Sequence, residues 1–185
     1  MISNMVRAYS SPRRAAMAAQ TRSAVVAAVA EELEGPLIEL CERVADRAGV
    51  SAATVRKLFP RREALLAAGL DQLLEDATPP KPTNSTPQAV VEAVFTYFDQ
   101  LGPERLWAAY RHAEESEALQ QRVRRVERAV ETAFKPLNVE SRSIGAFIRM
   151  LLDPLAYRRQ RASGVSAATA RANVTKAISA VLADN

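Results

Sequence analysis

Residues 45–66 read ADRAGVSAATVRKLFPRREALL, a segment in which one helix must end and another begin. Gly49 is suited to ending a helix, because glycine adopts the left-handed C-terminal conformation without a Cβ penalty. Ser51 follows two residues later, and its hydroxyl can accept a hydrogen bond from a free backbone N–H at the start of a new helix. A helix ending at glycine and another beginning almost at once at serine indicate a helix-turn-helix.

The short helix after the turn is predicted over residues 51–59, and Pro60 ends it. To enter a major groove about 12 Å wide, its exposed face needs small or hydrogen-bond-donating side chains. Arg62 opens the following helix, where the positive end of the helix dipole favours phosphate binding. The residues predicted to contact DNA are Ser51, Ala52, Thr54, Arg56, Lys57, Arg62 and Arg22. The alternative interpretation is an ordinary solvated helix face.

The composition favours a chain made of helices. The 185 residues are 48% hydrophobic and include only six Gly, and no segment alternates apolar and polar residues with a period of two. The fold class predicted is all-α, with about nine helices. The net charge is +4, and residues 1–66 carry ten Lys or Arg against seven Asp or Glu. This basic excess suits nucleic-acid binding, although genome base composition also accounts for many of the Arg and Ala residues.

Other classes of protein lack their characteristic residues here. A single Cys has no partner for an intrachain disulfide, and one Cys with one His excludes an ordinary zinc cluster. No apolar run approaches the roughly 18 residues that cross a bilayer, and no apolar region follows the N-terminal arginines as in a signal peptide. Without a Gly-rich phosphate loop or a Ser elbow, we expect neither an enzyme nor a cofactor. The expected location is cytoplasmic.

Four prolines between residues 78 and 87 divide the chain, because proline cannot continue a helix. We expect a helix-turn-helix DNA-binding domain over residues 12–77 and a helical ligand-binding and dimerisation domain over residues 85–185. Residues 1–11 are expected to form an arm. Pro36 is expected to open the first helix of the motif, and Pro154 to kink a long helix. The predicted helices span about 12–34, 36–48, 51–59, 61–76, 104–117, 119–134, 140–161 and 166–183, with a further helix that starts near residues 85–87 and ends at about residue 101.

Aromatic and aliphatic side chains of the C-terminal half indicate a pocket and a subunit contact. Trp107 and Tyr110 each combine an apolar body with a polar tip, which suits an apolar or amphipathic ligand. The predicted pocket residues are Phe95, Phe98, Trp107, Tyr110, Phe147 and Leu151. Apolar stripes on the last two helices predict half of a four-helix bundle across a two-fold axis. The predicted interface residues are Phe147, Leu155, Val174, Ile178 and Val181. The alternative for both sets is burial within the same chain.

The segment around the turn resembles the TetR family of bacterial transcriptional repressors. The resemblance is carried by Val44-Ala45, Ala48-Gly49-Val50-Ser51, Thr54-Val55, Phe59-Pro60 and Arg62-Glu63-Ala64-Leu65-Leu66. It implies an obligate homodimer, a small-molecule pocket in the C-terminal domain and ligand-induced release from an operator. Arg56 and Leu58 depart from the pattern, since the family usually has Tyr at the first position and Tyr or His at the second.

The function predicted from these features is a ligand-responsive transcriptional regulator, a repressor that binds a palindromic operator as a homodimer. Its expected partners are double-stranded DNA, a small apolar or amphipathic effector and a second copy of the chain, with no membrane. One alternative, motivated by Arg56 and Leu58, is a helical effector- or partner-binding protein whose DNA-binding module is weakened or lost. A second alternative is an architectural DNA-binding protein that takes no ligand.

Overall fold

The computed structural model describes residues 12–113 and 116–184, and within these ranges it contains helices and no strand. The all-α prediction is confirmed, whereas the arm expected over residues 1–11 lies outside the described ranges. The helices are α1 (Pro12–Glu32), α2 (Leu40–Ala48), α3 (Ala52–Leu58), α4 (Arg62–Asp76), α5 (Pro87–Leu101), α6 (Pro103–Ala113), α7 (Glu117–Phe134), α8 (Arg142–Leu151), α9 (Pro154–Ala162) and α10 (Ala167–Ala183), with a short 3-10 helix η1 (Lys135–Leu137).

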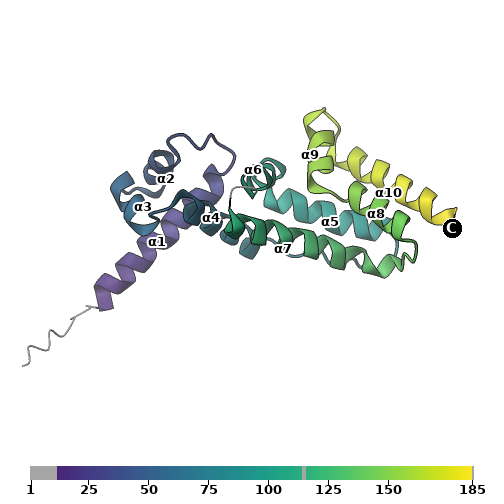
Figure 1. The fold of residues 1–185 in the computed structure, drawn as a ribbon, viewed down its shortest axis with the longest axis horizontal. Coiled ribbons are helices and arrows are strands. Elements are labelled where there is room, and N and C mark those ends of the chain that lie inside the picture. Colours follow the sequence, from purple (N-terminus) through teal and green to yellow (C-terminus); the bar gives the residue numbers. More distant parts are fainter. Residues whose placement is uncertain (1–11, 114–115, 185) are drawn as a thin grey trace, which may run out of the picture.

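Helices α1 to α4 gather at one end of the elongated molecule (Figure 1). Helix α1 packs against α2 and α4, and α2 packs against α3. A Cβ atom at Gly69 of α4 would lie 2.5 Å from Cγ1 of Val29 in α1, so these two helices approach closely where the side chain is missing. The shared core is apolar and includes Val25, Val44 and Leu65, all fully buried.

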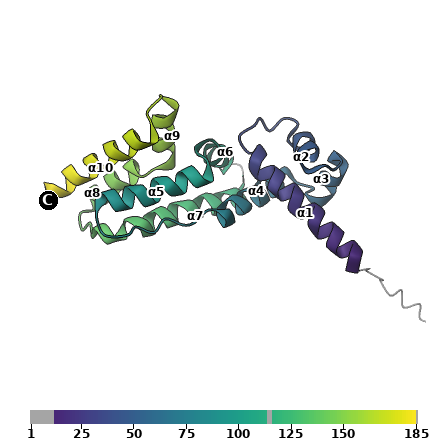
Figure 2. The same cartoon turned by 180° about the vertical axis from the view of Figure 1, so that it is seen from behind.

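Helix α5 is the centre of the C-terminal half, where it packs against α6, α7 and α10 (Figure 2). Thr86 accepts a hydrogen bond from the N–H of Ala89, and Pro87 occupies the first turn, where its missing N–H removes no helical hydrogen bond. The remaining helices complete the bundle, with α6 against α7 and α9, and α8 against α9 and α10. The proline segment therefore ends in a capped helix start.

Two ion pairs join the first four helices to the later ones. Arg122 of α7 donates to both carboxylate oxygens of Asp71 in α4, with Nε–Oδ1 at 3.1 Å and Nη2–Oδ2 at 2.5 Å. Arg105 of α6 lies 3.3 Å from the carboxylate of Glu34, just beyond α1. Helices α6 and α7 are thus tied directly to the elements that carry the helix-turn-helix.

The helix before the turn begins later than the sequence predicts. Pro36 lies in the preceding turn, and Glu39, at the start of α2, has a left-handed backbone with φ of 60°. Arg43 accounts for the difference, because its side chain donates to the carboxylate of Glu32 (2.8 Å) and to the carbonyl of Ile38 (2.8 Å). The turn closes around this guanidinium, and the prediction of a helix start at Pro36 is wrong.

The long helix predicted over residues 140–161 is two helices, α8 and α9. Oδ1 of Asp153 accepts hydrogen bonds from the N–H groups of Leu155 (2.8 Å) and Ala156 (3.1 Å). Pro154 therefore occupies the first position of a capped helix, where proline is favoured, instead of kinking a continuous one. The described ranges consequently hold one α-helix more than expected.

Candidate functional site

The turn between α2 and α3 has the geometry that its sequence indicates. Gly49 has φ of 66° and ψ of 33°, the left-handed conformation that ends a helix. The N–H of Val50 donates to the carbonyl of Ala45 at 3.0 Å, which satisfies a carbonyl that the end of α2 leaves free. Only one residue then separates the turn from Ser51, so α3 starts at a fixed angle to α2.

Ser51 caps α3 as predicted. Its hydroxyl accepts from the N–H of Thr54 at 3.2 Å, and the hydroxyls of the two residues lie 2.9 Å apart. The Thr54 hydroxyl is therefore already engaged within the cap. Of these two predicted DNA-contacting residues, Ser51 is exposed and Thr54 is half-buried.

Helix α3 has one buried and one exposed face. Val55 is fully buried and Phe59, which follows the helix, is 5% exposed, so both anchor the helix on the core. Arg56 and Lys57 are exposed on the opposite side. Leu58 is half-buried and packs against the core, which agrees with a packing role in place of the polar residue usual in the family it resembles.

Arg56 is engaged with a neighbouring helix. Its Nη2 donates to Oε1 of Glu42 in α2, and the two side chains remain 58% and 46% exposed. An exposed ion pair of this kind contributes little to stability, but it orients the arginine and offsets its charge. Glu42 cannot be recognised from the sequence, because its position resembles that of any carboxylate on a solvated helix face.

Two further arginines were predicted to contact DNA, Arg22 of α1 and Arg62 of α4. The guanidinium of Arg22 in α1 lies over the Phe59 ring, 4.4 Å from its centroid, and Nη1 is 3.5 Å from the carbonyl of Leu58. Arg22 is thus held at the C-terminal end of α3. Arg62 is the first residue of α4 and is exposed. The structure brings the exposed residues of α3 together with Arg22, and Arg62 begins the next helix.

The residues predicted to line a ligand pocket lie in different surroundings. Phe95 and Phe98 are fully buried and form an aromatic cluster with Tyr157, whose ring centroid lies 4.3 Å and 6.0 Å from theirs. Trp107 is half-buried, with the guanidinium of Arg158 5.0 Å from its ring centroid. These contacts favour the alternative interpretation of a packed core. Of the remaining residues, Leu151 is half-buried and Phe147 is 37% exposed.

Tyr110 is the predicted pocket residue that borders a cavity. This space of about 220 Å³ lies between α6, α7 and the turn from α8 to α9. Its apolar lining includes Val126, Val130 and Leu152, all buried, and its charged lining is Glu127, Glu131, Arg149 and Asp153. The hydroxyl oxygen of Tyr110 is buried, with no hydrogen-bond partner among the residues that the structure describes. Burial, and then the nearby carboxylates, raise the pKa of this hydroxyl, so it remains protonated.

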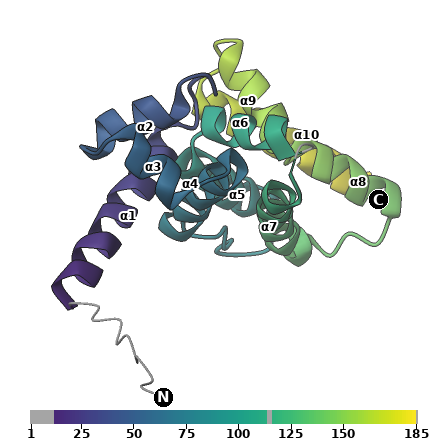
Figure 3. The same ribbon diagram turned by 60° about the vertical axis from the view of Figure 1, so that its left-hand side comes forward.

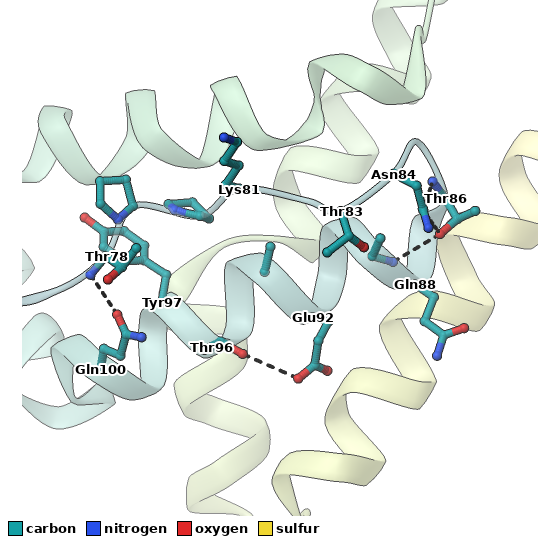
Figure 4. A pocket seen from close by; sticks show the side chains of 14 residues that line it. Thr78, Lys81, Thr83, Asn84, Thr86, Gln88, Glu92, Thr96, Tyr97 and Gln100 are labelled. Atoms are coloured by element: carbon teal, nitrogen blue, oxygen red, sulfur yellow. Dashed lines mark hydrogen bonds between the residues drawn. The ribbon is translucent and has the colours of Figure 1, made fainter.

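A larger groove of about 550 Å³ lies between the proline segment and α5 (Figure 4). More than half of the residues that line it have hydroxyl or amide side chains. The N–H of Thr78 donates to the side chain of Gln100 at 2.9 Å, and the hydroxyl of Thr86 donates to Asn84 at 2.6 Å. The first contact joins the start of the segment to α5, and the second lies within the segment.

The residues predicted at a subunit interface fall into two groups. Val174 and Ile178 of α10 are 3% and 0% exposed within this chain, so they present no surface to a second copy. Leu155 and Val181 are half-buried. Phe147 of α8 remains available, together with Met150 on the same helix, which is 58% exposed and was not predicted. The large apolar side chains that are exposed in this half of the described chain are therefore on α8.

Within the described ranges, no helix combines the length and apolar character needed to cross a membrane, and no group of His, Cys, Asp and Glu side chains gathers to hold a metal. The arrangement that stands out is a helix, a left-handed glycine turn and a short capped helix with two exposed cationic side chains, Arg56 and Lys57. This arrangement defines the structural class as a helix-turn-helix protein with an additional helical half.

The fold is similar to that of a solved TetR transcriptional regulator. The crystal structure of a TetR transcriptional regulator from Rhodococcus sp. RHA1 matches it with a TM-score of 0.54, covering 92% of this chain and 98% of the other at 18% sequence identity. No protein-family model and no curated protein matches the chain by sequence. The likeness in fold thus extends over nearly the whole chain, at a low sequence identity.

Proposed function

We propose that this protein is a transcriptional regulator, a repressor that binds a palindromic DNA operator as a homodimer and is released by a small apolar or amphipathic effector. Residues 12–77 would bind DNA, and residues 85–185 would bind the effector and the second subunit. The observation that carries the proposal is the placement of α3, anchored by Val55 and Phe59 with Arg56 and Lys57 exposed. As part of this proposal, the protein acts in the cytoplasm, catalyses no reaction and uses no cofactor.

The DNA-binding step follows from the size and charge of α3. A helix of this length fits across a major groove, and its exposed Arg and Lys side chains can donate to guanine or to phosphates. In a symmetric dimer the two copies of α3 would enter successive major grooves, about 34–36 Å apart. Phe147 and Met150 supply the exposed apolar surface on which α8 would meet its symmetry mate.

The effector is proposed to bind in the cavity beside Tyr110. A ligand there would contact α6 and α7, and these helices hold Glu34 and Asp71 through Arg105 and Arg122. Displacement of α6 or α7 would therefore be passed to α1 and α4. A ligand that favours the displaced arrangement shifts the population away from the DNA-binding spacing.

Selection of duplexes from a random library by the full-length protein tests the DNA-binding step. The expected result is enrichment of a palindrome with two half-sites about one helical turn apart. Light scattering of the complex should show two copies of the chain per duplex. Recovery of no sequence, with the protein folded, would favour the alternative of a helical partner-binding protein, for which the engagement of Arg56 by Glu42 is the supporting observation.

The effector step has its own test. Compounds that release the selected duplex should raise the thermal unfolding temperature of the free protein, because they bind the folded state. A Val130→Phe substitution, which fills the cavity from its apolar side, should abolish release while leaving DNA affinity unchanged. Release that persists in this variant would place the effector elsewhere.

A further inference from the structure

The N-terminal half of α1 stands apart from the rest of the protein. Residues 12–24, called here the free half of α1, are all exposed except Thr21, which is half-buried; the first buried residue is Val25. Figure 3 shows this part of the helix projecting beyond α2 and α3, away from the C-terminal helices. At 1.5 Å per residue it is about 20 Å long.

The charge of this segment has one sign. It contains Arg13, Arg14 and Arg22, and the first acidic residue of the chain is Glu31. Its alanines favour a helix, but an isolated helix of this length is marginal in water, so a partner that binds the arginines would stabilise it. The uncompensated positive charge selects an anionic partner.

The position of the segment makes it continuous with the candidate DNA-binding surface. Arg22 lies over Phe59 and beside Leu58, so the free half starts at the C-terminal end of α3. Arg14 is eight residues before Arg22, which puts it about 80° around the helix from Arg22 and about 12 Å further out. Arg13 is nine residues before Arg22, about 180° around the helix, and its side chain is exposed in the first turn.

Polyanionic DNA fits this surface better than a protein does. Met17 is the single large apolar side chain exposed on the free half, at 61%, which is far less than the apolar core of a stable protein interface. In contrast, a helix about 20 Å long that starts at the end of α3 extends past the edge of a groove about 12 Å wide. With α3 in the groove, the outer end of the free half would be able to reach the phosphates that flank the groove.

We propose that the free half of α1 is a second DNA-contacting element, in which Arg13 and Arg14 bind phosphates that flank the groove occupied by α3. This inference rests on the proposed DNA-binding function and extends its contact area. Such phosphate contacts fix the register and orientation of the protein on the duplex without reading its sequence.

The test compares the salt dependence of DNA binding in matched variants. The probe is the duplex that the wild-type protein selects from a random library, with affinity measured by fluorescence anisotropy. Arg13→Ala with Arg14→Ala should reduce the slope of log affinity against log salt by about two, while Arg13→Lys with Arg14→Lys should retain it. Arg124→Ala with Arg128→Ala removes the same charge from an exposed face of α7 and should leave the slope unchanged. Hydroxyl-radical footprints of the first variant should lose protection at the flanks only.

An unchanged slope and footprint in the Arg13 and Arg14 alanine variant would overturn the inference while leaving the proposed function intact. A change in its oligomeric state with an unchanged slope would assign the segment to a subunit contact and also overturn it. If the wild-type protein selects no duplex, the proposed function itself fails, so the two failures are distinguishable.

Discussion

Arg56 of α3 forms an ion pair with Glu42 of α2, through Nη2 and Oε1. This contact joins the two helices of the motif by their exposed side chains. It also places a negative charge beside an arginine that we propose contacts DNA. Contact of Arg56 with a guanine or phosphate would therefore compete with Glu42, and the carboxylate would repel the phosphates of a bound duplex.

Removal of this carboxylate should strengthen DNA binding. Glu42→Gln leaves Arg56 with its full charge and removes the repulsion, so the affinity for the selected duplex should rise and the salt slope should increase by up to about one. Stability should change by less than about 1 kcal/mol, because the pair is exposed. Glu75→Gln, at an exposed position of α4, is the matched control. A weaker affinity in Glu42→Gln would show that the carboxylate holds Arg56 in the binding orientation.

The exposed cations of α3 should be needed for binding and not for folding. Arg56→Ala with Lys57→Ala should weaken binding and lower the salt slope by about two, measured by anisotropy. The free energy of unfolding should stay within about 0.5 kcal/mol of the wild-type value, since both side chains are exposed. Unchanged affinity in this double variant would remove α3 from the proposed interface.

The glycine turn should tolerate a side chain poorly for reasons of backbone conformation alone. A Cβ at Gly49 would meet no atom within 4 Å, but its φ of 66° is unfavourable for alanine. Gly49→Ala should therefore lower the free energy of unfolding by about 1–2 kcal/mol in urea titrations. Gly145 lies inside α8 with only an Arg149 nitrogen at 3.9 Å, so Gly145→Ala should be neutral or stabilising by up to about 1 kcal/mol. Equal effects of the two substitutions would contradict the conformational explanation.

Tyr157 should make stability sensitive to alkaline pH. Its hydroxyl donates to Oδ1 of Asp99 at 2.6 Å, and burial, followed by this hydrogen bond, raises its pKa from 10.0 to about 12. Because the folded-state pKa exceeds the unfolded one, the stabilisation is complete below about pH 10 and is lost as pH rises through about 12. Tyr157→Phe should be less stable at neutral pH by about 1–3 kcal/mol and should lose less stability over that range. Urea titrations at stepped pH measure both, and parallel pH profiles for the two proteins would refute the assignment.

Local chemistry was sufficient to predict the helix-turn-helix and most helix boundaries. Gly49, Ser51 and Pro60 act within a few residues of themselves, through backbone conformation, capping and a missing N–H, so their effects can be read along the chain. The break between α8 and α9 also has a local cause. Asp153 before Pro154 is a capping signal, but the apolar stripe running across it favoured one long helix.

Contacts between segments far apart in the chain determined the features that the sequence did not predict. The start of α2 depends on Arg43 reaching Glu32, and the state of Arg56 depends on Glu42, neither of which periodicity can reveal. Val174 and Ile178 have the spacing of an apolar helix face, but a spacing does not say whether that face meets its own chain or a second one. Side-chain pattern thus determined which elements form, whereas the relative placement of helices far apart in the chain determined which side chains remain available to DNA, ligand or a second subunit.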